Sequence, residues 1–284
     1  MMQDMEQRDR FSIFYLADFS AAGRIAFAHA LKIALAFSAE LSIVLTKAVS
    51  ATDNNWPHNP PVRTTLEQWQ ILRNGSRRAA VSNELGIAIK KIDRNTMNPS
   101  AAIAYHLERN RVDLIVLSAH FQAHLLRQTR DNPFLNLMQQ TSAQVLFIPE
   151  RTAGFVSHTN GSVSLSNIMV PVTRSPHPES AIKDAGALGY LLGDRRVNIS
   201  LVHVGDASGI PAVQLPTYDG CSWNQVLRNG EAADEINALA YVLPADLIVM
   251  TTNGRNADGC ARRESVTARV LQKAPCPVLI ISAP

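Results

Sequence analysis

The chain has 284 residues, of which 46% are hydrophobic and 18% charged, and its formal net charge is +3. This hydrophobic fraction is too high for a disordered protein, and no run approaches the roughly 20 apolar residues of a membrane-spanning helix. The weak and dispersed positive charge argues against nucleic acid as a partner. Residues Met1–Arg10 are too polar for a signal peptide, and three widely spaced cysteines form neither a disulfide framework nor a metal knuckle, so we expect a cytoplasmic protein.

Short β-branched runs alternate with helical patterns through the first half of the chain. Several runs are apolar without alternation, which is typical of strands covered on both faces. Alternating strands and helices predict a parallel sheet with right-handed crossovers, that is, a doubly wound α/β domain. The predicted strands are Ser12–Ala17, Leu41–Thr46, Ile87–Ile92, Leu114–Ser118 and Val145–Ile148, and the predicted helices are Ala21–Phe37, Thr65–Leu85, Pro99–Asn110 and Pro133–Gln140.

The second half of the chain repeats the first. Such internal repetition indicates two homologous units, because several matches keep nearly the same spacing. We therefore predict two tandem doubly wound α/β domains, at residues 1–150 and 167–284, and an exposed linker at 151–166, which is rich in small and polar residues. The matches are Val112–Ser118 with Ala245–Thr251 and Val145–Ile148 with Val278–Ile281, both 133 residues apart, and Ile13–Ser20 with Ile168–Ser175, 155 residues apart.

The second domain is shorter than the first between its second and fourth strands. The deficit is 25 residues, because the offset between the repeats falls from 158 at Ile43–Leu45 to 133 at Val112–Ser118. Residues Gly205–Ser222 contain glycines and prolines and show no helical period. We therefore predict that the second domain lacks the second helix of the first.

Candidate binding residues lie after the first and fourth predicted strands of each domain. In open parallel sheets, ligands bind beyond the carboxyl ends of the strands, where the strand order reverses. The most informative loop is Thr251–Ser265, which contains Gly254 and Arg262 and leads into the helical run Val266–Lys273. A glycine-bearing loop before a helix offers free backbone N–H groups and a positive dipole end, which suit an anion, and Ser265 is a natural N-cap.

The residues from Ala245 to Ile281 resemble the C-terminal signature of the universal stress proteins, a strand, loop, helix and strand ending in Ala-Pro-Cys-Pro-Val-Leu. Leu16–Ser20, with Asp18, resembles the opening strand and acidic turn of that family. The resemblance covers nearly the whole chain and implies an adenine nucleotide alpha hydrolase-like fold and a role in the stress response. It also implies that the last strands pair, either in a homodimer or in an intrachain pseudo-dimer of Val145–Ile148 with Val278–Ile281.

Some members of the family bind ATP through a motif of Gly, two residues, Gly, nine residues and Gly-Ser or Gly-Thr. In the second half its positions fall on Thr251, Gly254, Glu264 and Ser265, so only Gly254 and Ser265 match. In the first half they fall on Ser118, Phe121, Asp131 and Asn132, with no glycine. The family's nucleotide-binding Asp matches Asp18 in the first half and is replaced by Thr173 in the second.

Electrostatics favour loss of simple ATP binding. A carboxylate at Glu264, about 4 Å from a phosphate charge, costs on the order of 4 kcal/mol at an effective dielectric near 20. A micromolar ligand has about 8 kcal/mol of binding free energy in total. Arg255, Arg262 and Arg263 could offset the charge, although a solvated face is the favoured interpretation of Arg262 and Arg263.

Each candidate residue also has a structural interpretation. Ser265 could serve only as a helix cap, and Asp18 could only stabilise a turn. His120 and His124 have the spacing of two metal ligands on a helix, but no third ligand is evident nearby, so we expect no metal. Cys276 lies between two prolines and is expected to be a buried apolar group, and no histidine stands beside Cys221 or Cys260 to make either a nucleophile.

Three functions are compatible with these residues. The first is a non-enzymatic stress-response module that binds or signals through an unidentified protein partner. The second is an adenine-nucleotide switch that binds ATP or AMP with slow or no hydrolysis, centred on Thr173, Thr251, Gly254 and Ser265. The third, an adenylating enzyme of similar architecture, needs a Ser-Gly-Gly-x-Asp-Ser turn after the first strand, and neither half has one.

Overall fold

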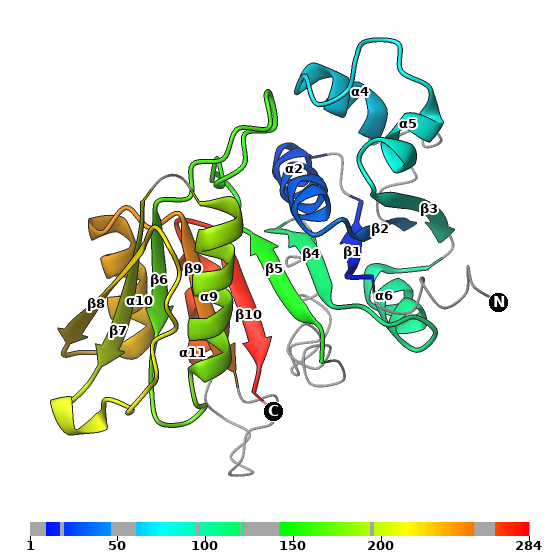
Figure 1. Cartoon of the computed structure of the whole chain (residues 1–284). Coiled ribbons are helices and arrows are strands. Elements are labelled where there is room, and N and C mark those ends of the chain that lie inside the picture. The colour runs from blue at the N-terminus through cyan, green and yellow to red at the C-terminus, as the bar shows by residue number, and fades with distance from the viewer. Residues whose placement is uncertain are drawn as a thin grey trace.

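The strands of the protein form one continuous sheet, in which two parallel halves meet. The computed structural model describes residues 10–17, 20–46, 61–94, 97–119, 121, 142–193, 196–252 and 265–283. Within these residues the 10-stranded sheet has the order β3-β2-β1-β4-β5-β10-β9-β6-β7-β8 (Figure 1). The strands are β1 (Ser12–Leu16), β2 (Glu40–Thr46), β3 (Ala88–Arg94), β4 (Leu114–Ser118), β5 (Gln144–Ile148), β6 (Asn167–Pro171), β7 (Val197–Val204), β8 (Cys221–Arg228), β9 (Leu247–Thr252) and β10 (Val278–Ser282).

Every strand pairing within each half is parallel, and the two halves are joined by the antiparallel pairing of β5 with β10. At this seam Leu146 pairs with Leu279 and Val145 with Ile280. The strand order 3-2-1-4-5 of the first half recurs as 8-7-6-9-10 in the second. The predicted fold class, two tandem doubly wound α/β domains, is confirmed.

Helices cover both faces of the sheet and enclose two hydrophobic cores. In β1 the side chains alternate between them: Ile13 and Tyr15 belong to one core, and Phe14 and Leu16 to the other. Helices α2 and α9 lie side by side on one face near the seam (Figure 1). The helices are α2 (Ala21–Ala36), α4 (Val62–Gln68), α5 (Arg78–Asn83), α6 (Pro99–Leu107), α9 (Glu179–Leu192), α10 (Ala232–Val242), α11 (Val266–Lys273) and the 3-10 helix η1 (Ala207–Gly209).

None of the described helices has the length and apolar character needed to cross a bilayer. The predicted helix Pro133–Gln140 lies outside the described residues.

The aspartates of the repeated motif have equivalent roles in the two halves. The Asp113 carboxylate accepts a hydrogen bond of 2.9 Å from the backbone N–H of Ser12 at the start of β1. The Asp246 carboxylate accepts two of 2.8 Å from the N–H groups of Ser166 and Asn167 at the start of β6. Each aspartate therefore satisfies the first backbone donors of a central strand, which accounts for its presence in both copies.

The connection between β2 and β3 differs from the prediction. The expected helix Thr65–Leu85 is two short helices, α4 and α5, separated by turns. Gln70 and Gly75 have positive φ angles of 60° and 79°, a left-handed conformation that cannot continue a right-handed helix. In the second domain, the corresponding connection between β7 and β8 contains only η1 among its regular elements, so the predicted loss of a helix is confirmed.

The segment between the domains is exposed in part, as its composition predicted, and buried in part. Phe155, Val156 and Leu165 are fully buried in the core shared by α2 and α9. Gly161 has a φ of +68°, and a Cβ there would lie 2.4 Å from the Trp69 ring. The small residues thus allow close packing against the first domain, and a few apolar residues among them anchor the segment.

His29 of α2 holds this segment in place. Its Nδ1 donates to the Ile25 carbonyl oxygen at 2.8 Å, and its Nε2 accepts from the backbone N–H groups of Phe155 and Val156 at 3.0 and 3.2 Å. Because Nε2 faces two donors, the imidazole must be neutral. Burial accordingly lowers the pKa of His29 to about 4, although its hydrogen bond to Ile25 favours the charged form.

We predict that His29 makes the fold sensitive to acid. In the unfolded chain the pKa of a histidine is about 6.5, so between pH 6.5 and 4 the unfolded state binds a proton that the folded state does not. The contribution of His29 is fully present above pH 6.5 and is lost as the pH falls towards 4, by about 3 kcal/mol. Urea unfolding of the wild type and of His29→Gln across this range tests the prediction. Between pH 6.5 and 4, the slope of the unfolding free energy against pH should be smaller in His29→Gln than in the wild type, by the amount that one bound proton contributes. The same slope in both proteins would contradict the prediction.

Candidate functional site

Each domain has one point where the strand order reverses. The chain leaves β6 to form β7 and β8 on one side and later returns to form β9 and β10 on the other. In the first domain, β1 stands in the same way between β2 and β4. Ligands of open α/β sheets bind at the carboxyl ends of such strands, so these two points are the candidate sites.

The described candidates of the second domain lie around its reversal point. Thr173 follows β6 and is exposed, whereas Thr251 lies within β9 and is 7% exposed. Ser265 precedes α11, and its hydroxyl accepts a hydrogen bond of 3.1 Å from the Ala268 N–H, so it is an N-cap. The predicted binding residues Gly254 and Arg262 lie outside the described residues, and so does Asp18 of the first domain.

The two described motif positions of the first domain are closed, and Asp131 and Asn132 lie outside the described residues. Ser118, at the end of β4, is 0% exposed, and so is Phe121, which occupies the second glycine position of the phosphate motif. A buried phenylalanine brings a large side chain into the position where glycine would let a backbone approach a phosphate.

A cavity of the second domain that the sequence did not reveal lies beside Thr173. Counted with the solvent at its mouth, it measures about 560 Å³, a volume within the range of small-molecule sites. Strand residues such as His203 and Gln225 line it, together with residues of the segment that replaces the missing helix. The lining includes Val172 and Leu201 from the strands and Ile210, Pro211 and Val213 from that segment.

Two side chains hold the start of this segment. His203 is 7% exposed, with Nδ1 2.9 Å from the Val172 carbonyl oxygen and Nε2 3.1 Å from that of Asp206. Arg174 donates to the carbonyl oxygen of Ser208. A Cβ on Gly209 would lie 2.8 Å from His203 Nε2, so glycine permits the close approach of the turn. The side chains of β7 and of the loop after β6 therefore shape the cavity.

Metal and nucleophilic chemistry find no support in the described residues. They contain no group of three or more His, Cys, Asp or Glu side chains placed to hold a metal ion. His120, His124 and Cys260 lie outside them. Cys276 is 4% exposed and burial raises the pKa of its thiol to about 12, which confirms the expected buried apolar group. Burial also raises the pKa of the Cys221 thiol, which disfavours the reactive thiolate.

Comparison with known proteins finds similarity to one family. A universal stress protein of Synechocystis is 26% identical over 150 residues, covering 47% of this chain and 94% of the relative. Residues 218–282, which include β8 to β10 and α11, match the model of the universal stress protein family. The C-terminal part of the chain is therefore similar to the universal stress proteins. Because the family match covers these residues alone, the tandem arrangement rests on the repeats and on the fold.

Solved structures share the fold along nearly the full length. A universal stress protein from Archaeoglobus fulgidus covers 96% of both chains with a TM-score of 0.58 and 14% identity. A Pseudomonas aeruginosa protein of unknown function covers 98% of this chain and 94% of its own, with a TM-score of 0.57 and 13% identity. The fold of nearly the whole chain is therefore shared with these structures.

We predict that His203 restrains the segment over the second-domain cavity. The prediction takes the His203 tautomer that carries its proton on Nε2 and donates to the Asp206 carbonyl. His203→Ala removes that hydrogen bond, at a cost of about 1 kcal/mol, so amide exchange in residues 205–210 should accelerate about fivefold. Hydrogen-exchange mass spectrometry measures this. Gln225→Ala is the control, because Gln225 lines the same cavity and makes no hydrogen bond to the segment among the described contacts. Equal acceleration in both variants would contradict the restraint.

Proposed function

We propose that the chain is a universal stress protein and acts as a non-enzymatic binding and signalling module of the stress response, in which the ancestral ATP motif is eroded. The observation that carries the proposal is the fully buried Phe121 at a glycine position of the first-domain motif. A phosphate-binding loop needs accessible backbone N–H groups. A buried aromatic side chain at this position is packed in the core and prevents a phosphate from approaching the backbone.

The second domain supports the same conclusion in a weaker form. Thr251 stands at the first glycine position and is buried, so its side chain is committed to packing. The hydroxyl of Ser265 is already the acceptor of its own helix cap. The sequence adds the carboxylate of Glu264 at the third glycine position, where a phosphate would meet a like charge.

An adenine-nucleotide switch is the second candidate, and two observations favour it. The cavity of about 560 Å³ beside Thr173 is large enough for a planar base, and the N-terminus of α11 lies at the carboxyl edge of the same domain. In this function the protein binds ATP or AMP with slow or no hydrolysis.

Thermal unfolding with ATP, with AMP and without ligand separates the two functions. We expect millimolar nucleotide to leave the midpoint of the wild type unchanged. A ligand present at about 100 times its dissociation constant stabilises by about 2.7 kcal/mol, roughly 5 °C for a chain of this size. A shift of that magnitude would overturn the proposal in favour of the nucleotide switch.

A matched pair of cap variants locates any nucleotide that does bind. Ser265→Ala and Ser20→Ala each remove an N-cap hydrogen bond of 3.1 Å, at the starts of α11 and α2, and each costs about 1 kcal/mol of stability. A site in the second domain would lose affinity only in Ser265→Ala. Glu264→Gly should strengthen binding at that site, because it removes the opposing charge.

A further inference from the structure

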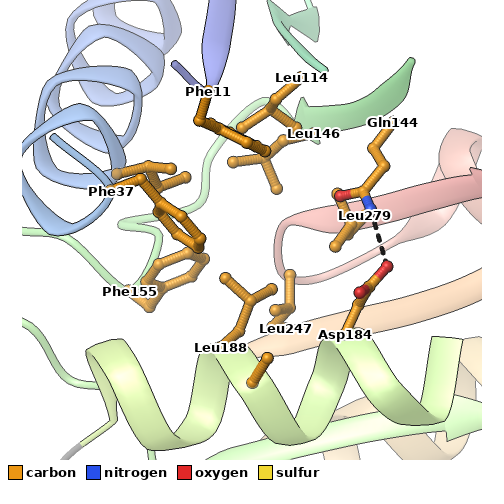
Figure 2. A pocket seen from close by; sticks show the side chains of 12 residues that line it. Phe11, Phe37, Leu114, Gln144, Leu146, Phe155, Asp184, Leu188, Leu247 and Leu279 are labelled. Carbon is orange, nitrogen blue, oxygen red and sulfur yellow. Dashed lines mark hydrogen bonds between the residues drawn. The ribbon is translucent and has the colours of Figure 1, made fainter. Parts of the chain in front are cut away.

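A second cavity lies at the seam between the two domains, away from the carboxyl-edge sites. It measures about 590 Å³, counted with the solvent at its mouth. Figure 2 shows that its lining comes from both domains and from the segment between them. The nucleotide motif does not involve these residues, and of the lining only Leu247 and Leu279 lie within the family match.

The floor of this cavity is built from repeat-equivalent leucines. Leu114 and Leu247 are the first residues of β4 and β9, and Leu146 and Leu279 face each other across the β5–β10 pairing. All four are at most 4% exposed. The floor is therefore rigid, apolar and close to twofold symmetric.

The walls break this symmetry. Phe11 and Phe37 stack with their ring centroids 4.8 Å apart, and Phe155 stands beside them on the same side (Figure 2). The facing wall, from α9, presents Leu188 and the small Ala187. Aromatic rings on one side and a small residue on the other leave room for a flat apolar body.

One end of the cavity is polar. Gln144 donates from Nε2 to Oδ2 of Asp184 at 2.7 Å, and Figure 2 shows this pair across the cavity from the phenylalanines. The described contacts give the other carboxylate oxygen no protein donor. Burial raises the pKa of this half-buried carboxyl, and the neighbouring Lys183 and the Gln144 hydrogen bond oppose that rise only in part.

We propose that this cavity binds a small organic amine with an apolar, ring-bearing body. The ring packs between the phenylalanines and Leu188, and the ammonium group donates to the Asp184 carboxylate, which Gln144 orients. The carboxylate repels phosphates and carboxylic acids, so the ligand class differs from the nucleotides considered for the second-domain cavity.

Three probes with one ring system test the proposal: 1-naphthylmethylamine, 1-naphthalenemethanol and 1-naphthoic acid. Calorimetric titration of the full chain should give the tightest binding for the amine, with the alcohol about tenfold weaker and the acid weaker still. Asp184→Asn should reduce the amine affinity about tenfold and leave that of the alcohol nearly unchanged. Glu179→Gln is the matched control, because it removes an exposed carboxylate from the same helix and should change neither.

Every outcome decides the proposal. Equal binding of amine and acid, or an amine affinity that Asp184→Asn leaves intact, would overturn the choice of ligand class. Absence of saturable binding of all three probes would overturn the site. Ala187→Phe fills the cavity and should abolish binding, and its folded state is checked by circular dichroism. Excess AMP should not displace the amine, since a displacement would place the probe in the second-domain cavity instead.

Discussion

The structure depends on a single antiparallel strand pairing in an otherwise parallel sheet. Strand edges expose unpaired N–H and C=O groups, and β5 and β10 would each be an edge if its domain stood alone. Their pairing satisfies both edges at once and places the buried residues Leu146 and Leu279 opposite each other. It fixes the spacing of α2 and α9, and hence the width of the cavity between them. The edges that remain are β3 and β8, and β3 carries Lys90 and Lys91, charges that discourage further strand addition.

The segment after β5 reinforces this arrangement by packing against α2. His29 accepts two backbone donors from residues 155 and 156 and stays neutral, so a buried polar contact replaces water without a buried charge. The same segment supplies Phe155 to the cavity at the seam. The connection between the domains thus acts as part of the first domain's core, and the acid sensitivity of His29 extends to the site that it helps to build.

Repetition made most of the fold predictable. The motifs around Asp113 and Asp246 are alike because both aspartates accept hydrogen bonds from the start of a central strand. A structural role that both halves share can therefore be recognised as a repeated motif in the sequence. Three features could not be predicted by the same means. The break between α4 and α5 depends on the left-handed Gln70, and the burial of the linker depends on contacts with Trp69 and His29 that no local pattern encodes. The two cavities arise where remote segments meet, so their lining residues share neither a motif nor a period.

Fusion of two related domains into one polypeptide has a chemical consequence at Asp184. Two identical copies related by rotation would present this acid twice, once on each side of the axis, together with a second set of the aromatic rings. In a single chain the two sides can differ, and here one side presents aromatic rings and the other an acid. Duplication therefore permits an asymmetric cavity within a nearly twofold-symmetric fold. A homodimer cannot form such a cavity on its axis, because its two halves are identical.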